Sequence, residues 1–331
     1  MKTRFYIYQS GELKRQDESL VLITSSEKIY IPIMQIELIN VFSQVTFNKV
    51  ALSLLNQYGI IMNLFNYYGV YQGSFIPDYP KHGKNIIAHV EHVKDEIKRF
   101  NIAKEIIYAS SLNMLAVLKY YHKKRAICSE EIHKMGSIIK ELENTTCLNI
   151  NSLMLIEARI KQLYYSCFDK IILNPVFRFE SRSVQPPKNE INAMMSFGYS
   201  ILYSIIESII HRSSLVISLP FIHSLDRRKE GLQYDIADIF KPVIIDRTIF
   251  RMINRNQITK LHFEEYKNGI YLSKYGSKIF IEEVESFLKS TINLDQFNRK
   301  YSYNQLLSKE IHKLTNHIIE KKKYQGFKMR W

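Results

Sequence analysis

Cysteine is scarce in this chain of 331 residues. The three cysteines, Cys128, Cys147 and Cys167, are widely spaced and form no Cys-x-x-Cys pair. This pattern predicts neither a disulfide framework nor a zinc cluster, and it favours the reducing cytoplasm as the location of the protein. No apolar run approaches the roughly eighteen residues that a membrane span needs, so we expect no membrane partner.

Several common functional motifs are also missing. The sequence contains no P-loop and no Gly-x-Ser-x-Gly motif, so we expect an activity that does not consume ATP and does not use a nucleophilic serine elbow. The N-terminus is positively charged but has no long apolar core, which argues against a secretory signal.

Positive charge is abundant, with 46 Lys and Arg residues against 32 acidic residues and a net charge of +14. A surplus of this size favours a polyanionic partner, although composition alone is also compatible with a merely well-solvated surface. Basic and aromatic residues alternate in two stretches, residues 119–125 and the tail 321–331. Such stretches can bind phosphates and stack on bases. Candidate DNA-binding residues in the first are Lys119, Lys123, Lys124 and Arg125.

The distribution of turn residues predicts an α+β protein with two domains. Residues 1–76 are rich in short β-type runs, with one helix expected over 48–58 that ends at Gly59. Two prolines and a glycine mark residues 77–84 as a linker. Residues 85–331 have helical periodicity and predict a larger all-α domain. Strands are expected at Arg4–Tyr8, Leu20–Thr24, Lys28–Ile31, Ile36–Phe42, Ile60–Phe65 and Val70–Phe75.

One carboxylate falls on an apolar helix face. Residues 153–172 lack Gly and Pro and follow a helical period, with Ser152 as the expected N-cap. Glu157 lies inside the apolar stripe of this helix. A buried carboxylate costs several kcal/mol unless it is paired, protonated or bound to a metal. Pairing with Lys161, four residues later, and metal binding are both compatible with the pattern.

A histidine and two aspartates form a second cluster of possible ligands. Asp235 and Asp238 share a face if their segment is helical, and His223 precedes them in a stretch broken by Pro220. Imidazole and carboxylate oxygen suit Mg²⁺ or Mn²⁺ better than a thiophilic metal.

These segments resemble the CRISPR-associated spacer-acquisition integrases (the Cas-one family) over nearly the whole chain. The resemblance is carried by Ile-Glu-Ala-Arg around Glu157, Pro-Phe-Ile-His-Ser around His223, Tyr-Asp-Ile-Ala-Asp-Ile-Phe-Lys-Pro around Asp235 and Asp238, and Asp246-Arg-Thr-Ile-Phe. The segment that begins at Arg182 and the N-terminal β-rich region are similar as well. One departure is Asn189, where the family often has Asp.

The resemblance implies a metal-dependent DNA endonuclease and integrase of prokaryotic antiviral defence. Glu157, His223 and Asp238 would be the catalytic metal ligands, with Asp235 in a supporting position or as an alternate ligand. A DNA 3′-hydroxyl would attack a phosphodiester of the CRISPR repeat. The implied partners are double-stranded DNA (prespacer and repeat), a second copy of the chain that dimerises through the β-domain, and the small Cas-two subunit. Arg182 is a further candidate DNA contact.

A non-catalytic, basic DNA-binding scaffold is the alternative interpretation. It accounts for the charge and for the aromatic-basic stretches. It leaves a carboxylate on the apolar face of a helix unexplained. The two hypotheses differ in geometry, because only the enzyme requires Glu157, His223 and Asp238 to approach one point.

Overall fold

The chain forms two compact units in the computed structural model, Met1–Lys81 and His82–Trp331. The structure describes residues 3–146, 149–225, 231–294 and 299–329. Cys147 and the last two residues of the basic tail lie outside this part. The division between the units falls within the stretch 77–84, where the sequence predicts a linker.

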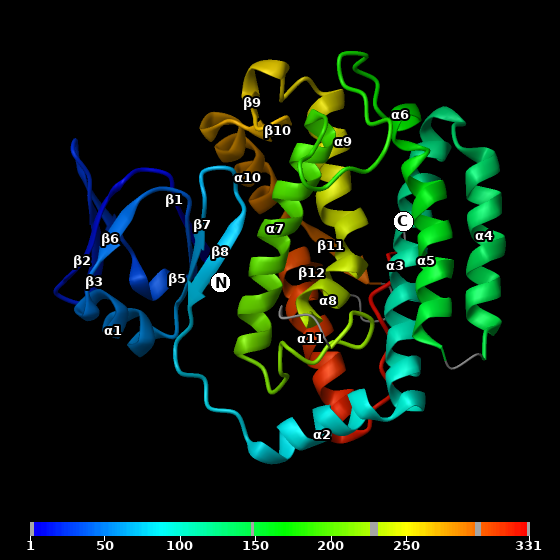
Figure 1. The fold of residues 1–331 in the computed structure, drawn as a ribbon, viewed down its shortest axis with the longest axis horizontal. Coiled ribbons are helices and arrows are strands. Elements are labelled where there is room, and N and C mark those ends of the chain that lie inside the picture. The colour runs from blue at the N-terminus through cyan, green and yellow to red at the C-terminus, as the bar shows by residue number, and fades with distance from the viewer. Residues whose placement is uncertain (1–2, 147–148, 226–230, 295–298, 330–331) are drawn as a thin grey trace. The chain divides into compact units, whose positions relative to one another are not determined.

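The N-terminal unit contains two four-stranded sheets (Figure 1). One has the order β1-β5-β7-β8, in which the first three strands are parallel and β8 is antiparallel to β7. The other has the order β4-β3-β2-β6. The bounds are β1 Thr3–Ile7, β2 Gly11–Gln16, β3 Ser19–Ile23, β4 Lys28–Ile31, β5 Ile36–Val41, β6 Val45–Phe47, β7 Ile61–Phe65 and β8 Tyr71–Phe75, with a 3₁₀ turn η1 at Ile33–Gln35.

Helix α1 (Lys49–Tyr58) completes this unit. Asn48 caps its start by accepting a hydrogen bond from the backbone N–H of Ala51, and Gly59 ends it with a left-handed φ of 61°. Leu54 and Leu55 of α1 belong to one core with buried side chains of both sheets. The predicted helix and its glycine stop are therefore present.

Strand β2 is absent from the sequence prediction because Ser10-Gly-Glu has the composition of a turn. The structure gives Gly11 another role. A β-carbon at Gly11 would lie 2.3 Å from the carbonyl oxygen of Ile23 on the paired strand β3, so the close approach of the two strands requires glycine. The sequence prediction also lacks the short strand β6.

The C-terminal unit is mainly helical, which agrees with the predicted fold class. Its helices are α2 Gly83–Lys94, α3 Glu96–Arg125, α4 Ser129–Asn144, α5 Ile150–Tyr165, α6 Phe168–Ile171, α7 Glu190–His211, α8 Leu232–Lys241, α9 Arg247–Asn254, α10 Lys274–Lys289 and α11 Tyr303–Glu320. A π-helical turn, η2 (Pro242–Asp246), joins α8 to α9, and a 3₁₀ turn, η3, spans Lys260–His262.

Two antiparallel hairpins make this unit less purely helical than predicted. They are β9 (Phe263–Tyr266) with β10 (Gly269–Leu272), and β11 (Thr291–Leu294) with β12 (Arg299–Ser302). Strands this short and partly polar are too brief to show a clear period of their own, so an analysis of hydrophobic periodicity does not detect them.

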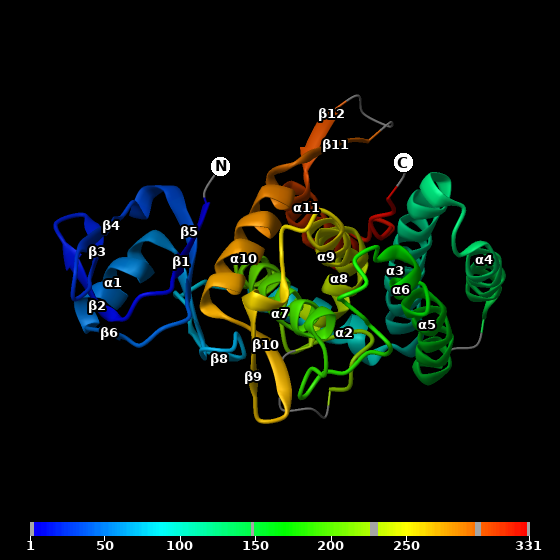
Figure 2. The same cartoon turned by 90° about the horizontal axis from the view of Figure 1, so that it is seen from above.

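Three long helices pack side by side at one end of the C-terminal unit. They are α3, α4 and α5, which Figure 2 shows nearly end-on. Helix α3 also packs against α8, because Ser110 donates a hydrogen bond to the carbonyl of Asp238 and Asn113 donates one to that of Ile239. Helix α3 thus packs against both α5 and α8, the two helices that carry the candidate ligands Glu157, Asp235 and Asp238.

Helix α7 is long and apolar enough to pass a test for a membrane span. Of its most apolar window, however, 78% is buried inside the protein. This burial is what the core helix of a globular unit requires.

Candidate metal and catalytic site

Glu157 lies on the buried face of α5, as the helical period predicts, with only 8% of its surface exposed. The helix begins earlier than expected, because Asn149, and not Ser152, is its N-cap. Burial raises the pKa of Glu157, and the neighbouring charge of Lys161 offsets this only in part.

Lys161 joins two of the three predicted ligands. Its ammonium nitrogen lies 2.8 Å from Oε1 of Glu157, one turn earlier on α5, and 3.2 Å from Oδ2 of Asp238 on α8. The local Glu–Lys pair considered from sequence therefore exists. It coexists with the approach that the metal hypothesis requires, because the same ammonium group holds two carboxylates from different helices.

A second lysine neutralises Asp238. Lys241, one turn later on α8, donates a hydrogen bond to Oδ1 of Asp238. Burial opposes ionisation of Asp238, but Lys161 and Lys241 together hold the pKa of this carboxyl well below its usual range. Lys241 also lies over the rings of Tyr199 and Tyr203, at 5.0 and 4.9 Å from their centroids. Two carboxylates and two ammonium groups thus balance each other's charge.

Asp235 organises the loop that carries His223. Its fully buried carboxylate accepts hydrogen bonds from the backbone N–H of Phe221 at 2.6 Å and of Ile222 at 3.0 Å. The Nδ1 atom of His223 lies 2.5 Å from Oδ1 of the same group. This contact raises the pKa of His223 although burial works against the charged ring. A carboxylate on Nδ1 directs Nε2 to any metal, as is usual for metal-binding histidines.

Arg99 of α3 holds the same loop from its carbonyl side. It donates to the carbonyl oxygen of Phe221 at 2.9 Å and to that of His223 at 3.3 Å. Sequence reasoning missed Arg99, because it lies 122 residues before Phe221 in the chain. The contribution of Lys241 was also missed, although its position three residues after Asp238 was a usable signal.

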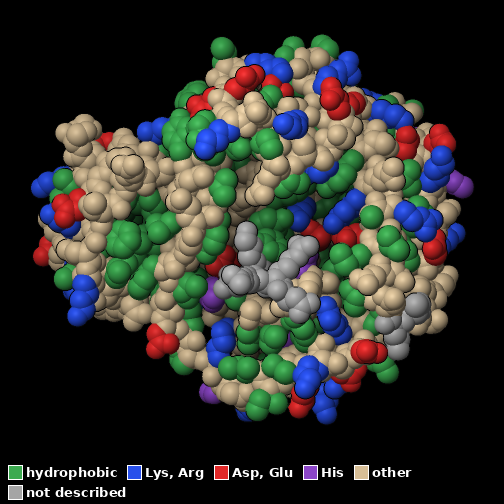
Figure 3. Space-filling view, in the orientation of Figure 1, with side chains coloured by type: hydrophobic (Ala, Val, Ile, Leu, Met, Phe, Trp, Pro, Cys, Tyr) green, Lys and Arg blue, Asp and Glu red, His purple; other side chains and the backbone are tan. Residues whose placement is uncertain are grey.

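A small cavity of about 30 Å³ adjoins these groups. It is lined by Ser110, Met114, Lys161, Tyr164, Tyr165, Tyr199, Asp238, Lys241, Pro242 and Asp246. A space of this size holds about one water molecule. On the face drawn in Figure 3, basic, acidic and histidine side chains gather in a hollow of the helical unit.

The donor set fits a hard divalent cation in its chemistry. Glu157 Oε1 is buried and has no hydrogen bond of good geometry, although it lies within ion-pair distance of Lys161. Among the described residues, however, only a different cluster brings three His, Cys, Asp or Glu donors within 4.8 Å of one another. Glu157 and Asp238 both contact Lys161, and His223 interacts electrostatically with Asp238. The ligand atoms of these three residues do not all lie within 4.8 Å of one another.

The predicted DNA contacts differ in how free they are. Lys119, Lys123 and Lys124 are exposed near the end of α3, although Lys124 also donates a hydrogen bond to the hydroxyl of Tyr120 at 2.6 Å. Arg125 donates a hydrogen bond to the carbonyl oxygen of Ile171, and Arg182 donates to Oδ1 of Asn192. These two arginines have structural contacts already.

Two aromatic residues of the tail are not exposed, although its composition favours stacking on bases. Tyr324 and Phe327 are buried, and the Tyr324 hydroxyl donates to Glu310 at 2.6 Å. The aromatic residues of this described part of the tail therefore serve the core.

Compared with known proteins, the chain matches one family model over residues 5–286. That model describes the CRISPR associated protein Cas1. The chain belongs to the Cas1 family. It is 38% identical over 332 residues to CRISPR-associated endonuclease Cas1 2 of Thermodesulfovibrio yellowstonii, with 100% of both chains covered. It is 35% identical to CRISPR-associated endonuclease Cas1 of Fusobacterium nucleatum, with 100% of this chain and 98% of the relative covered.

Solved structures agree with this assignment. A CAS1 protein from Thermotoga maritima matches with a TM-score of 0.86 at 33% identity, covering 99% of this chain and 100% of that one. A casposase bound to integration product matches with a TM-score of 0.88 at 17% identity, over 100% and 94% of the two chains. A Cas6-RT-Cas1–Cas2 complex matches with a TM-score of 0.82 at 19% identity, over 100% and 36%. The last two similarities show the fold.

The family, the fold class and the enzyme class predicted from sequence are confirmed. The chain is a CRISPR-associated endonuclease of the Cas1 family.

Proposed function

We propose that this Cas1 protein inserts spacer DNA into a CRISPR array with the help of one divalent cation, Mg²⁺ or Mn²⁺, held by Glu157, His223 and Asp238. The observation that carries this proposal is the meeting of two buried carboxylates, from α5 and α8, at the single ammonium group of Lys161. Carboxylates from separate helices rarely approach one another inside a protein without a cation to share.

The residues present suit such a cation. Carboxylate oxygens and an imidazole nitrogen are ligands that Mn²⁺ and Mg²⁺ accept, and the set contains no thiolate. Asp235 is committed to the backbone of the His223 loop and to Nδ1 of His223, which supports the positioning role for Asp235 over the role of alternate ligand.

The chemistry proposed is a transesterification at phosphorus. The 3′-hydroxyl of the incoming strand attacks a phosphodiester at the repeat boundary, a new P–O bond forms, and the old 3′-oxygen leaves with a proton. One ester replaces another, so no nucleotide is consumed. With water as the nucleophile the same site would cleave DNA. When bound, the cation would polarise the phosphodiester and stabilise the charge that builds on its oxygens.

Lys161 and Lys241 would change partners in this reaction. A cation held by the carboxylates would compensate their charge, and the two ammonium groups would no longer need to neutralise them. Each is then available to a phosphate oxygen of the DNA. Arg99 and Asp235 keep the loop of His223 in place from opposite sides throughout.

DNA binding by the wider surface is supported by the net charge of +14 and by the exposed lysines Lys119, Lys123 and Lys124. Arg125 and Arg182 are secondary candidates because of their structural contacts. If lysines bind phosphates, the logarithm of affinity falls linearly with the logarithm of salt concentration, with a slope of about −0.9 per contact.

The proposed assembly contains a homodimer and the small Cas2 subunit. A fold neighbour is described in a complex of Cas1 with Cas2, and another, a casposase, is described as bound to an integration product. In the N-terminal unit, several large apolar side chains are exposed, including Tyr30 at 60% and Met34 at 67%. Such side chains support the proposed role of the β-domain in dimerisation.

The direct experiment is a strand-transfer assay with prespacer duplex, repeat DNA, the Cas2 subunit and Mn²⁺. We expect joined product from the wild-type chain and from Arg159→Ala, a control that removes only an exposed ion pair with Glu141. Asp238→Ala and His223→Ala should give none while still binding DNA. Full joining by either variant would refute the assignment of the site.

A further inference from the structure

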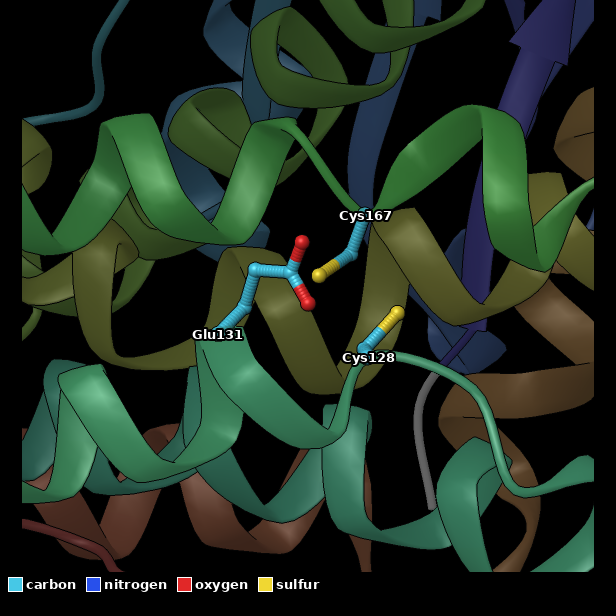
Figure 4. Close-up of side chains that lie close together, drawn as sticks. All are labelled: Cys128, Glu131 and Cys167. Carbon is cyan, nitrogen blue, oxygen red and sulfur yellow. The ribbon is translucent and has the colours of Figure 1, made fainter.

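A second cluster of ligand-type side chains lies away from the carboxylates of the catalytic site. Cys128, Glu131 and Cys167 bring two sulfur atoms and a carboxylate oxygen within 4.8 Å of one another. Figure 4 shows the three side chains close together, with the Glu131 carboxylate beside the sulfur of Cys167. No local sequence pattern indicates this group, because the two cysteines are far apart in the chain and form no Cys-x-x-Cys pair.

Local structure brings the three donors together at two helix starts. Cys128 is the N-cap of α4, and Glu131 follows in the first turn of the same helix. Cys167 is the N-cap of α6, directly after the end of α5. The spacing Cys-x-x-Glu places the first two donors side by side, in the way that a Cys-x-x-Cys pair does in zinc sites.

We propose that Cys128, Cys167 and Glu131 form a binding site for a thiophilic divalent cation of the zinc type, with a water molecule as the fourth ligand. Tetrahedral coordination by two sulfur atoms and one oxygen requires ligand atoms about 3.5–3.8 Å apart, so the observed cluster needs only small side-chain rotations. Binding releases the two thiol protons to solvent, and the thiolates and the carboxylate then donate to the cation.

Burial and charge agree with this assignment. Cys128 is 5% exposed and Cys167 is fully buried, whereas the side chain of Glu131 is 14% exposed and leaves a route for the ion and for water. Lys170 lies 2.5 Å from Glu131. Two thiolates and one carboxylate carry three negative charges, which a divalent cation and Lys170 together neutralise.

The carboxylate distinguishes a cation site from a simple thiol pair. A disulfide between Cys128 and Cys167 would involve only the two sulfur atoms, whereas Glu131, which is also paired with Lys170, brings a carboxylate close to them (Figure 4). A bound cation uses all three groups. It would also tie the start of α4 to the end of α5, the helix that carries Glu157.

The test uses Co²⁺ as the probe, because Co²⁺ bound to thiolate gives a sulfur-to-metal charge-transfer absorption. The proposed ligands of the catalytic site, Glu157, His223 and Asp238, include no thiol, so this absorption reports the cysteine site alone. The full chain is stripped with a chelator, kept reduced and titrated with Co²⁺ and then with Zn²⁺. We expect the absorption to saturate at one Co²⁺ per chain, to disappear as Zn²⁺ displaces Co²⁺, and the melting temperature to rise with Zn²⁺.

Matched variants locate the ligands. Cys128→Ser and Cys167→Ser should abolish the charge-transfer absorption, and Cys147→Ser should retain it as a control for the loss of one thiol. Glu131→Gln should weaken Co²⁺ binding at least tenfold, whereas its neighbour Glu130→Gln, which loses only an exposed contact with Lys134, should bind as the wild type does. Circular dichroism shows whether each variant is folded, and Glu131→Gln keeps the test open if a buried serine prevents folding.

Three results would overturn the proposal. The first is the absence of the charge-transfer absorption from the reduced wild-type chain. The second is an absorption that survives in folded Cys128→Ser. The third is a Cys128–Cys167 disulfide, found by mass spectrometry in oxidised protein that binds no Co²⁺ after reduction, which would make the cluster a redox pair.

Discussion

Lys161 occupies the place that a cation would take between Glu157 and Asp238. Its side chain is about one-third exposed, at 30%, while the two carboxylates it contacts are buried. Without this ammonium group or a metal ion, two buried negative charges would face each other. Lys161 therefore stabilises the two carboxylates in the absence of an ion, and it would compete with a bound ion for the same oxygens.

Replacing Lys161 with Met should make the protein depend on metal for its stability. In chelator, we expect a loss of about 1–3 kcal/mol of unfolding free energy, because Glu157 loses its partner and Asp238 keeps only Lys241. Added Mn²⁺ should restore stability and raise the melting temperature more than it does in the wild type. Lys134→Met, which removes an exposed pair with Glu130, is the control and should show no extra response to Mn²⁺. Equal Mn²⁺ responses in both variants would contradict this role.

Asp246 is the titrating residue with the clearest consequence for stability. It accepts hydrogen bonds from Tyr164 at 3.0 Å and Tyr199 at 2.7 Å, and burial raises its pKa to about 6 from the ordinary 3.8. Because the folded state binds the proton of Asp246 more tightly than the unfolded state does, protonation of Asp246 stabilises the fold. This contribution is fully present below the pKa of the unfolded state. It is lost as the pH rises toward 6.

Asp246→Asn should remove this pH dependence, since the amide does not ionise. As the pH rises from about 4 to about 6, the unfolding free energy of the variant should increase relative to that of the wild type, by on the order of 3 kcal/mol at most. The difference should be constant above that range. Parallel curves for the two proteins over the whole range would show that Asp246 does not titrate there.

At the scale of elements, the site depends on how the loop before α8 is held. Asp235 accepts hydrogen bonds from backbone N–H groups of this loop, and Arg99 donates hydrogen bonds to its backbone carbonyl groups. His223 is therefore oriented from both sides. Helix α8, the π-helical turn η2 and helix α9 follow one another without a break, and this run carries Asp235, Asp238 and Asp246. Helix α3 supplies Arg99 to the loop and hydrogen bonds to α8.

Loosening this loop should weaken catalysis without removing a ligand. Arg99→Ala and Asp235→Asn should each lower the strand-transfer rate about 10–100-fold, because they orient His223 without touching the cation. A higher Mn²⁺ concentration should recover part of the rate, and DNA affinity should stay near that of the wild type. Complete loss that no Mn²⁺ concentration relieves would identify Asp235 as a ligand itself.

The sequence predicts local features of these elements better than contacts between them. The period of α5 places Glu157 on a buried face, and the three-residue spacing places Asp235 and Asp238 together on α8. The sequence does not predict that Asn149 caps α5, because several nearby polar residues could also be the N-cap. Gly11 looks like a turn residue until its partner Ile23 is known. Arg99 and the Cys128–Cys167 contact depend on long-range packing, which no local pattern records.

At the scale of the whole molecule, the proposed dimer contact and the candidate catalytic site lie in different units. The described residues of the candidate catalytic site all lie in the helical unit. The β-unit exposes large apolar side chains such as Tyr30 and Met34, although the helical unit also exposes some, for example Leu261. Such exposure is costly unless another surface covers the side chains.

A charge placed on the β-unit should therefore separate assembly from chemistry. We expect the wild-type chain to have the mass of a dimer in light scattering at micromolar concentration. Met34→Lys should shift the equilibrium toward the monomer, because it sets a charge among exposed apolar side chains. The matched change Ile87→Lys, at a similarly exposed position on α2, should leave the mass unchanged. A monomeric wild type would contradict the proposed dimer.

The central claim is that Glu157, His223 and Asp238 hold one divalent cation that the reaction needs. The most direct measurement is a Mn²⁺ titration of the DNA-bound protein, followed by the paramagnetic resonance of free Mn²⁺, with DNA cleavage recorded in the same samples. The wild type should bind one Mn²⁺ per site and cleave DNA in proportion to occupancy. Glu157→Gln, His223→Ala and Asp238→Asn should each weaken Mn²⁺ binding at least tenfold and lose cleavage together with it. Unchanged Mn²⁺ affinity, or cleavage that persists, in folded variants would contradict the account.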